Sequence, residues 1–356
     1  MTKDKQLSFE GQTLYVGLDA HKTNWKIHPR MGHIELKGFS QDPDAALLAQ
    51  HMQRRYPGAT IKVVYEAGFC GFTIQRALAE QGIECIVVNP ADVPTSDKER
   101  KRKDDQRDAR KLSRELAEGS LKAIYVPAAD LEHARSVVRG RHRLVQDQTR
   151  CKNRIKHLLM FSGLEVQGTG RWSLKYVQAL QQIPCCSPTL KVALDLAIQQ
   201  YLSIRQLLSK ATLEVRKLAR QEPFLTLQPY LQSIDGVGLI NGMVIQTELQ
   251  DMSRFKTLDR LCDYCGLVPD ISSSNERRVV RGITHRGNEL VRAALVESAW
   301  VSLQRDPAML LKYQDYRRRM NAGKAIIRIA KHLLSRIRYV WQHQVLYQRG
   351  IVGASA

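Results

Sequence analysis

The sequence lacks any long hydrophobic run, and its first residues, MTKDKQLSFEGQ, lack the apolar stretch of a signal peptide. A helix needs about 20 consecutive apolar residues to cross a bilayer. These two absences exclude the common membrane and secreted classes, so we expect a cytoplasmic protein with no membrane partner.

A complete zinc pattern is also lacking, although the chain has seven cysteines. Cys262 and Cys265 form one CxxC, but no second such pair and no nearby pair of histidines completes a ligand set. The same stretch, RLCDYCGL, also fits a short helix that buries small thiols. In the cytosol we expect the cysteines to be reduced thiols.

Acidic residues are few relative to basic ones. Asp and Glu number 35 against 55 Lys and Arg, which gives a formal net charge of +20. A basic surface gains free energy on binding nucleic acid because counterions are released from the phosphates. Since the basic residues are clustered, a nucleic-acid partner is favoured over a merely soluble basic protein.

The first 126 residues predict an α/β domain. Strand-like runs at 13–19, 61–66 and 83–88 alternate with helical patterns at 42–56 and 72–82, and residues 24–39 fit an antiparallel meander. The segment DDQRDARKLSRELAEG, at 104–119, predicts one more helix. The expected order is three strands, helix, strand, helix, strand, helix.

From Pro127 onward the strand signal disappears, and the sequence predicts helices. Two long helices are expected over 127–222, a third, helical region over 223–348, and a tail at 349–356. The second long helix carries apolar residues at alternating spacings of three and four, as in a coiled-coil seam within or between chains; a helix packed on its own domain fits equally well. The seam comprises Leu194, Ile198, Tyr201, Ile204, Leu208, Ala211, Val215 and Leu218.

Asp19 and Glu66 stand at the ends of two predicted strands that would be neighbours at the centre of a sheet. The next helix could add Asp105 and Asp108, which share a helical face; Asp104 and Asp108 would also serve. Converging carboxylates repel one another unless cations intervene, and such oxygen ligands suit Mg²⁺ or Mn²⁺. The pattern predicts a two-metal site for phosphodiester chemistry, although each acid alone also fits an ordinary strand end or helix start.

Several motifs, in the same order, resemble the insertion-sequence family 110 transposases, in particular their 1111 subgroup. They are YVGLDAHK, VYEAGFCGF and KDDQRDARKLSREL, followed by GVGLINGMVIQTELQDMSRFKTLDRLCDYCGLVP and SSSNERRVVRGITHRGNELVRAAL. The resemblance implies a ribonuclease-H-like domain of the Holliday-junction-resolvase kind at 1–126. Long coiled-coil helices at 127–222 and an α-helical C-terminal transposase domain with a catalytic serine at 223–348 would follow.

The resemblance implies a DEDD set of metal-binding acids, with Mg²⁺ or Mn²⁺ as cofactor. Those acids fall on Asp19, Glu66, Asp105 and Asp108. The family generally has Lys-Thr-Asp where this chain has Lys103-Asp104-Asp105, so Asp104 is the alternative third acid. His21 could approach the metals or have a structural role.

The resemblance also implies a serine nucleophile in a Ser-Ser-Gly context. That motif falls on Ser273, Ser274 and Asn275, so Ser274 is assigned as nucleophile, with Ser272 and Ser273 as alternatives. Asn is the next best residue after Gly for a left-handed turn. A hydroxyl is a weak nucleophile until a base or metal activates it, and a run of serines by itself is usually a polar loop.

One glycine turn and several basic residues are the predicted nucleic-acid contacts. The turn resembles a helix-hairpin-helix, whose N–H groups can hold a DNA phosphate, although a simple turn between packed helices fits as well. The arginines after the serines could grip the surroundings of the scissile phosphate, or form a solvated basic loop. The full set is Lys101, Arg102, Lys103, Arg277, Arg278, Arg281, Arg286, Gly236 and Gly238.

The resemblance implies a bacterial, nucleoid-associated transposase that cleaves and rejoins donor and target DNA. It also implies a guide, a noncoding RNA encoded by the element, so that base pairing reads sequence while the protein reads shape and phosphates. A homo-oligomer, either dimer or tetramer, is expected because two DNA partners must be held together.

Three other functions fit parts of the sequence. A metal-dependent junction nuclease would use water as nucleophile and need no catalytic serine. A kinase or ATPase of the actin-like fold fits YVGLDAHKTN, but its second Asp-Gly-rich phosphate loop is lacking. A non-catalytic RNA-binding module would bind RNA without cutting DNA.

Overall fold

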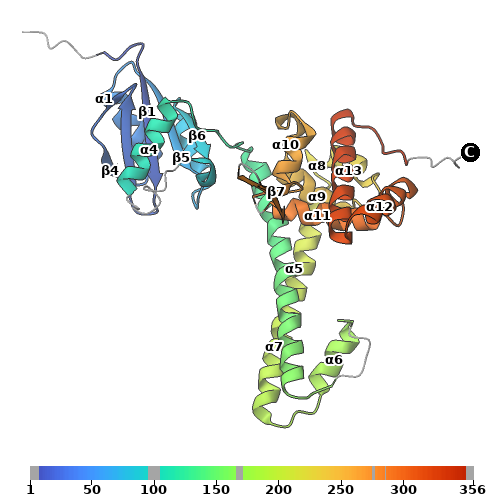
Figure 1. The fold of residues 1–356 in the computed structure, drawn as a ribbon. Helices are drawn as coiled ribbons and strands as arrows, with labels where there is room; N and C mark the ends of the chain where they lie inside the picture. The colour runs from blue at the N-terminus through green and yellow to red at the C-terminus, as the bar shows by residue number, and fades with distance from the viewer. Residues whose placement is uncertain (1–7, 95–104, 166–170, 275–276, 285, 350–356) are drawn as a thin grey trace, which may run out of the picture. The chain divides into compact units, whose positions relative to one another are not determined.

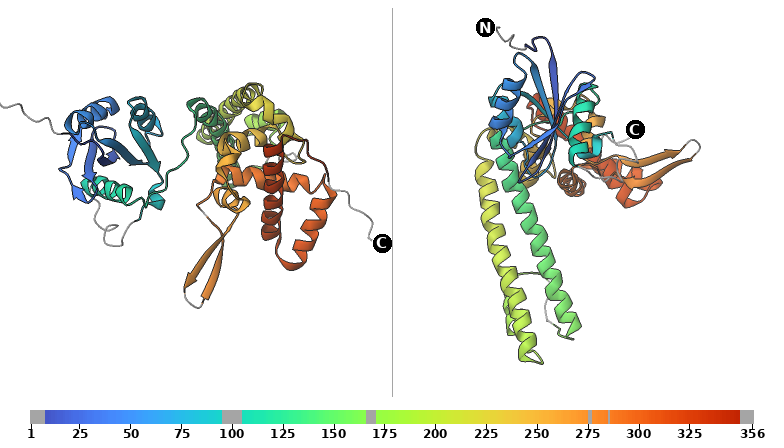
Figure 2. Two further views of the ribbon diagram at one scale, coloured as in Figure 1. Left: turned by 90° about the horizontal axis from the view of Figure 1, so that it is seen from above. Right: turned by 90° about the vertical axis from the view of Figure 1, so that its left-hand side faces the viewer.

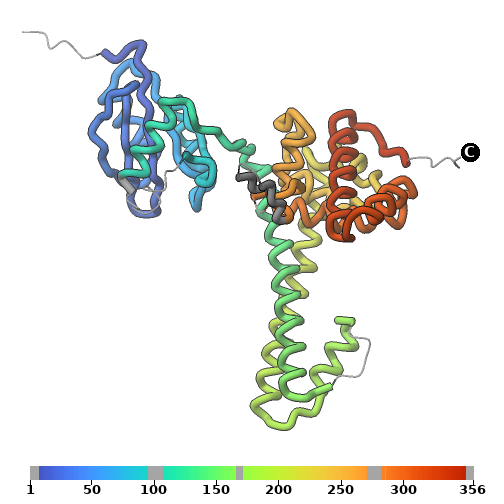
Figure 3. Tube along the Cα trace, viewed as in Figure 1, coloured from blue at the N-terminus to red at the C-terminus, as the bar shows by residue number. Residues whose placement is uncertain are grey.

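The computed structural model describes residues 8–94, 105–165, 171–274, 277–284 and 286–349, with side chains for all of these except 105–106 and 271–281. The chain divides into two compact units, Met1–Val126 and Pro127–Ala356, here called the first and second unit (Figures 1 and 3). Each unit has its own hydrophobic core, and each is described by itself.

The first unit is built on a mixed sheet. Its strands are β1 (Thr13–Ala20), β2 (Trp25–Met31), β3 (Ile34–Glu35), β4 (Phe39–Gln41), β5 (Thr60–Glu66) and β6 (Glu84–Val88). The strand order is β3-β2-β1-β5-β6, with β4 also paired to β2. β1 runs antiparallel to β2 and parallel to β5. The predicted meander and the central pairing of the two acid-bearing strands are confirmed, although the last run of the meander splits into β3 and β4.

Helices cover both faces of this sheet (Figure 2). α1 (Ala45–Arg55) and α2 (Thr73–Glu80) share a core with Leu14, Val16 and Leu18 of β1, which are completely buried. The other face packs against α4 (Asp105–Ala117), where Leu112 meets Val64 of β5. The two-residue alternation of strand side chains thus sorts the sheet into two cores.

α4 lies very close to β1 because Gly17 has no side chain. A Cβ atom at Gly17 would lie 1.9 Å from the carbonyl oxygen of Ala109 and 2.6 Å from the backbone nitrogen of Ser113. Across the sheet His28 pairs with Gly17, and its Nδ1 lies 3.2 Å from Ser113 Oγ. The helix is therefore fixed directly against the backbone of the central strand.

The second unit begins with two long helices. α5 (Ala129–Phe161) and α7 (Pro188–Leu218) pack side by side, and α6 (Leu174–Gln182) lies between them in sequence (Figure 1). The predicted seam residues of α7 are all buried or half-buried, and the buried ones near the start of α7 share a core with α5 and α6. The helices are confirmed; coiled-coil geometry stays a prediction.

Shorter helices form the main core of the second unit. They are α8 (Phe224–Gln232), α9 (Leu239–Leu249), α10 (Leu258–Tyr264), α11 (Glu289–Ser302), α12 (Pro307–Arg319) and α13 (Ala322–His343). The apolar face of α13 is buried, since five of its positions are at most 4% exposed. These positions are Ile326, Ile329, Leu333, Ile337 and Val340.

The prediction that strands disappear after Pro127 is wrong. β7 (Pro269–Ser274) and β8 (Arg277–Ile283) form an antiparallel hairpin, which projects from the helices of the second unit (Figure 2). Its sequence lacks the apolar alternation that indicates a strand. The backbone pairing of the two segments stabilises the hairpin, and the β-branched pair Val279 and Val280 was the local signal.

Two further expectations concern the burial of the CxxC cysteines and the absence of a membrane-spanning helix. Cys262 and Cys265 are buried in the core around α10, and burial raises the pKa of both thiols. Within the described residues, none of the helices has the length and apolar character needed to cross a bilayer.

Candidate functional site

The ends of β1 and β5 bring Asp19 and Glu66 side by side. Leu18 of β1 is level with Tyr65 of β5, so the next residue in each strand is one of the predicted acids. Neighbouring strands lie about 4.8 Å apart, and residues at the same level of a parallel pair point to the same face. Leu18 and Tyr65 point into the core beneath α1 and α2, so the two acids point to the opposite face.

That opposite face is the one that α4 covers, and α4 begins near the end of β1 (Figure 1). Ser113 of α4 meets His28 of β2. Arg107, earlier in the helix, lines a cavity with Lys26, which pairs with Asp19. α4 therefore runs antiparallel to β1, with its first turn near the carboxylate of Asp19.

The first turn of α4 carries the other predicted acids. Asp105 is the first residue of the helix, and Asp108 is half-buried. Ala109 and Leu112 face the sheet, and Asp105 and Asp108 lie one turn before them on the same stripe. The side chain of Asp105 and the whole of Asp104 lie outside the described residues.

Carboxylate oxygens are candidate metal ligands at this end of the first unit. The side chain of Asp19 is 22% exposed, and its Oδ2 lies 3.0 Å from Nε2 of His21. Among the side chains that the structure describes, no three His, Cys, Asp or Glu form a ready metal site; that of Asp105 is not among them. The donor set is of the kind that hard divalent cations prefer.

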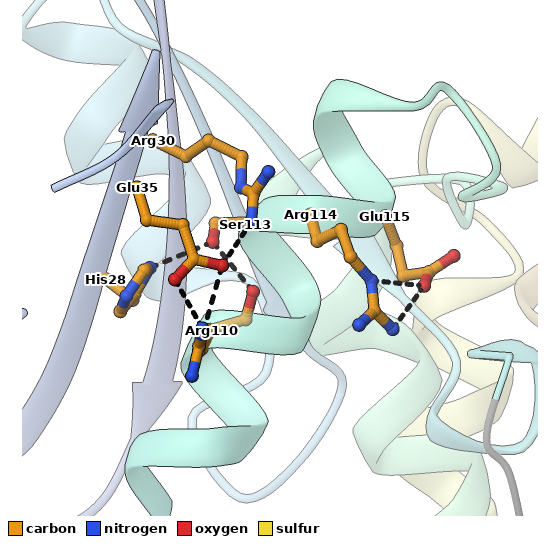
Figure 4. A network of polar contacts seen from close by, with 7 residues as sticks. All are labelled: His28, Arg30, Glu35, Arg110, Ser113, Arg114 and Glu115. Atoms are coloured by element: carbon orange, nitrogen blue, oxygen red, sulfur yellow. Dashed lines mark hydrogen bonds and ion pairs between the residues drawn. The ribbon is translucent and has the colours of Figure 1, made fainter. Parts of the chain in front are cut away.

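A polar network fastens α4 to the edge of the sheet (Figure 4). Glu35 accepts hydrogen bonds from Arg30 at 2.5 Å and from Nε of Arg110 at 3.0 Å. The Arg110 guanidinium holds the pKa of Glu35 below its usual range. Burial lowers the pKa of His28, which favours the neutral imidazole beside Ser113. No local sequence pattern predicts this network, because its members come from three separate elements.

Ser274, in the second unit, is the last residue of β7. Its backbone pairs with Arg277 at the start of β8, and Ser273 pairs with Arg278. The hairpin therefore places the backbones of these arginines directly opposite the serines. The side chains of these four residues lie outside the described ones, as does that of Arg281.

Of the remaining basic residues predicted to contact nucleic acid, the structure describes one. Arg286 is exposed just after the hairpin, and its backbone N–H donates to Thr284 Oγ1 at 3.2 Å. Lys101, Arg102 and Lys103 lie outside the described residues.

A buried acid that the sequence did not predict joins α9 to α5 and to the N-cap of α11, the helix that follows the hairpin. Glu248 of α9 is completely buried and accepts from Arg139 Nε at 2.6 Å, Arg139 Nη2 at 2.7 Å and Asn288 Nδ2 at 2.8 Å. Arg292 donates to the carbonyl oxygen of Thr284, just after β8, at 2.9 Å. A glutamate within the apolar run GMVIQTEL was the available signal, because a buried charge requires a partner.

The predicted glycine turn before α9 is present. Gly236 has φ +93°, and a Cβ atom there would lie 2.1 Å from the carbonyl oxygen of Ser298 in α11. Gly238 is the N-cap residue of α9. The turn thus brings α9 against α11, and a phosphate contact at its N–H groups stays a prediction.

A cavity of about 840 Å³ lies beside this turn. Its lining includes Arg141, Arg216 and Arg305. Asp235, just before the glycines, is paired with Arg349 through two hydrogen bonds of 2.6 and 2.9 Å. The acid nearest the turn is therefore neutralised from the C-terminal segment.

Comparison with known protein families identifies the class to which this protein belongs. Residues 16–162 match the IS110-type DEDD family described as "Transposase", and residues 228–314 match the "Transposase IS116/IS110/IS902 family". The protein is thus a DNA transposase, an enzyme with a DEDD-type region followed by a second region that matches a transposase family.

Individual relatives agree with the family match. A putative transposase (y4qE) of Sinorhizobium fredii is 30% identical over 307 residues, covering 85% of this chain and 75% of that protein. The transposase for insertion sequence element IS1111A of Coxiella burnetii is 25% identical, covering 63% of this chain and 61% of that protein. This chain belongs to the IS110 family of insertion-sequence transposases.

Proposed function

We propose that this transposase cleaves and rejoins donor and target DNA with two sets of groups, the acids of the first unit and Ser274 of the second. The observation that carries the proposal is the position of Asp19 and Glu66, level with each other at the ends of central strands. The start of α4 adds Asp108 on the same face.

The acid set fits a divalent cation. Asp19, Glu66, Asp105 and Asp108 would hold Mg²⁺ or Mn²⁺ through carboxylate oxygens. When bound, the metal would offset the mutual repulsion of the acids and stabilise negative charge on the reacting phosphate. His21, bonded to Asp19 at 3.0 Å, would orient that carboxylate.

Ser274 would act as the nucleophile. Its hydroxyl oxygen would attack the phosphorus of the scissile phosphodiester, forming a serine–phosphate ester and releasing one DNA hydroxyl. A hydroxyl from the other DNA partner would then attack that ester, restoring the serine and joining the strands. The location of Ser274 at the end of β7, opposite Arg277, supports a role near DNA phosphates.

Finer features of the fold belong to the same proposal. The first unit would be a ribonuclease-H-like domain of the Holliday-junction-resolvase kind, supported by its antiparallel β1–β2 pair followed by parallel β5 and β6. Within the second unit, 127–222 would be a coiled-coil part and 223–348 the transposase domain that carries the serine.

An element-encoded noncoding RNA would select the DNA by base pairing, and the protein would act as a homo-oligomer, either a dimer or a tetramer. The support is a net charge of +20, large enough to hold RNA and DNA backbones together.

The test uses the full-length protein purified with its RNA. Sequencing that RNA should give one discrete species, and DNA with complementary segments should be cut in Mg²⁺ but not in excess EDTA. Heterogeneous RNA would contradict the guide. Cutting in EDTA would contradict the metal-bound acids.

A further inference from the structure

A second cavity, of about 420 Å³, lies in the first unit between β2, the segment that joins β3 to β4, and α4. Its lining includes four cationic side chains, and none of the described lining residues is Asp or Glu. The four are Lys26, Lys37, Arg107 and Arg110. This cavity is separate from the residues that the sequence predicted as nucleic-acid contacts.

The cavity adjoins the acids directly. Lys26 is the cross-strand partner of Asp19, and directly opposite residues of antiparallel strands have Cα atoms about 4.5–5.5 Å apart. Arg107 immediately precedes Asp108 on α4. The cavity therefore flanks the acids on the β2 side.

The cationic side chains of the cavity differ in how far a neighbouring acid offsets their charge. Arg110 is bound to Glu35, which Arg30 also contacts (Figure 4), so these three groups together carry one net positive charge. Lys26 donates to the hydroxyl of Ser40 at 2.9 Å, a partner that carries no charge of its own. Lys37 is exposed, and no hydrogen bond or ion pair joins it to the described residues.

We propose that this cavity binds the phosphates of a nucleic-acid strand that follow the reacting phosphate at the acids, one at Lys26 and one at Lys37. Successive phosphates of one strand are separated by about 3.4 Å of helix rise, so a strand that leaves Asp19 across β2 brings its next phosphates to Lys26 and Lys37. Lysines bind phosphates as point charges. The site rests on the proposed function, since the acids mark the reacting phosphate, and its ligand class is a phosphodiester strand.

The first test is an acetylation footprint of the full-length protein in EDTA. Lys26 and Lys37 are acetylated with and without a saturating oligonucleotide, and their modification rates are read by mass spectrometry. We expect bound oligothymidylate, twenty nucleotides long, to slow both lysines several-fold. Unchanged rates with this probe and with oligouridylate of equal length would overturn the proposal. The probe that gives the stronger protection identifies the strand as DNA or RNA.

The second test compares two charge-matched double variants, Lys26→Gln/Lys37→Gln and Arg54→Gln/Arg55→Gln. Arg54 and Arg55 end α1, on the opposite face of the sheet. For a single strand, each lost phosphate contact reduces the slope of log K against log salt by about 0.7. The lysine variant should lose about 1.4 of slope and bind oligothymidylate several-fold more weakly, while the arginine variant changes little. Equal losses in both would overturn the site, with thermal melting as the check on folding.

Failure of this site and failure of the proposed function are distinguishable. Both tests run in EDTA, where no cleavage by metal-bound acids occurs. Protection of Lys26 and Lys37 without any Mg²⁺-dependent cleavage would support the phosphate site and contradict the proposed chemistry. Mg²⁺-dependent cleavage without protection of these lysines would contradict the phosphate site and leave the proposed chemistry supported.

Discussion

The two units hold their candidate groups in different ways. In the first unit, Asp19 and Glu66 end strands of the central sheet, and Asp108 stands on the helix that covers them. In the second unit, Ser274 stands at the far end of a hairpin whose base is held to α11 by the hydrogen bond from Arg292 to the Thr284 carbonyl oxygen. The acids are thus fixed by core packing, whereas the serine depends on a projecting element.

The units nevertheless share one packing device, a glycine beneath a helix. Gly17 leaves room for the Ala109 carbonyl of α4, and Gly236 leaves room for the Ser298 carbonyl of α11. In each case a methyl group would overlap with backbone, which cannot turn aside as a flexible side chain can. Close helix approach therefore depends on one residue in each unit.

The largest expected effect separates chemistry from folding in the first unit. Asp19→Asn removes a charged metal ligand while keeping the size of the side chain. Strand cleavage should fall by at least roughly 10³-fold, which is about 4 kcal/mol of transition-state stabilisation. Cleavage rates in Mg²⁺ measure the loss, and binding of DNA in EDTA should be unchanged or stronger. A variant that keeps a tenth of the wild-type rate would contradict the assignment.

The next effect tests the glycine device in both units. Gly17→Ala should destabilise the first unit by about 3 kcal/mol through overlap with Ala109. Gly236→Ala should cost the second unit at least about 3 kcal/mol, because its positive φ adds strain. Urea unfolding measures both.

Each glycine has a matched control. At Gly68 the nearest atom to an added methyl would be 3.9 Å away, and at Gly238 none would lie within 4 Å. Alanine at these two positions should cost less than about 1 kcal/mol. Equal effects at tested and control glycines would refute the packing argument.

The two regions were also predictable to different degrees. The alternation of the first 126 residues is local, so strand order and the meeting of Asp19 with Glu66 followed from it. The contacts of Arg110 with Glu35 and of Arg139 with Glu248 join residues 75 and 109 positions apart. No local pattern encodes such pairs. The sequence does not predict the hairpin, because Ser and Arg give no strand periodicity and a run of serines is usually a polar loop.

A smaller effect tests the buried ion pair that joins α5 to α9 in the second unit. Arg139→Met leaves the buried Glu248 without its bidentate partner. Loss of one partner of a buried pair costs about 3–5 kcal/mol, but Arg139 is 46% exposed, so about 2 kcal/mol is expected after allowance for solvent screening. Urea unfolding of the second unit should show it. Arg143→Met, at an exposed position of the same helix, should change stability by less than about 0.5 kcal/mol.

The smallest effect concerns pH and the first unit. Burial lowers the pKa of His28, so the unfolded chain binds a proton there more readily than the folded one. The stability contributed is complete above about pH 6.5, the ordinary histidine pKa, and declines as the pH falls through the folded-state value. His28→Gln should therefore make the stability of the first unit less sensitive to acid. His33→Gln, at an exposed turn, is the control, and an equal change there would contradict the assignment.

The most direct test of the central claim is a search for a covalent serine–DNA adduct. Protein with its RNA is incubated with labelled DNA in Mg²⁺, denatured, and resolved on a gel. Wild type should carry label, and both Ser274→Ala and Asp19→Asn should carry none, because the acids and the serine would act in one reaction. Full strand cleavage by Ser274→Ala, with no labelled protein in wild type, would contradict the account and indicate a nuclease that uses water.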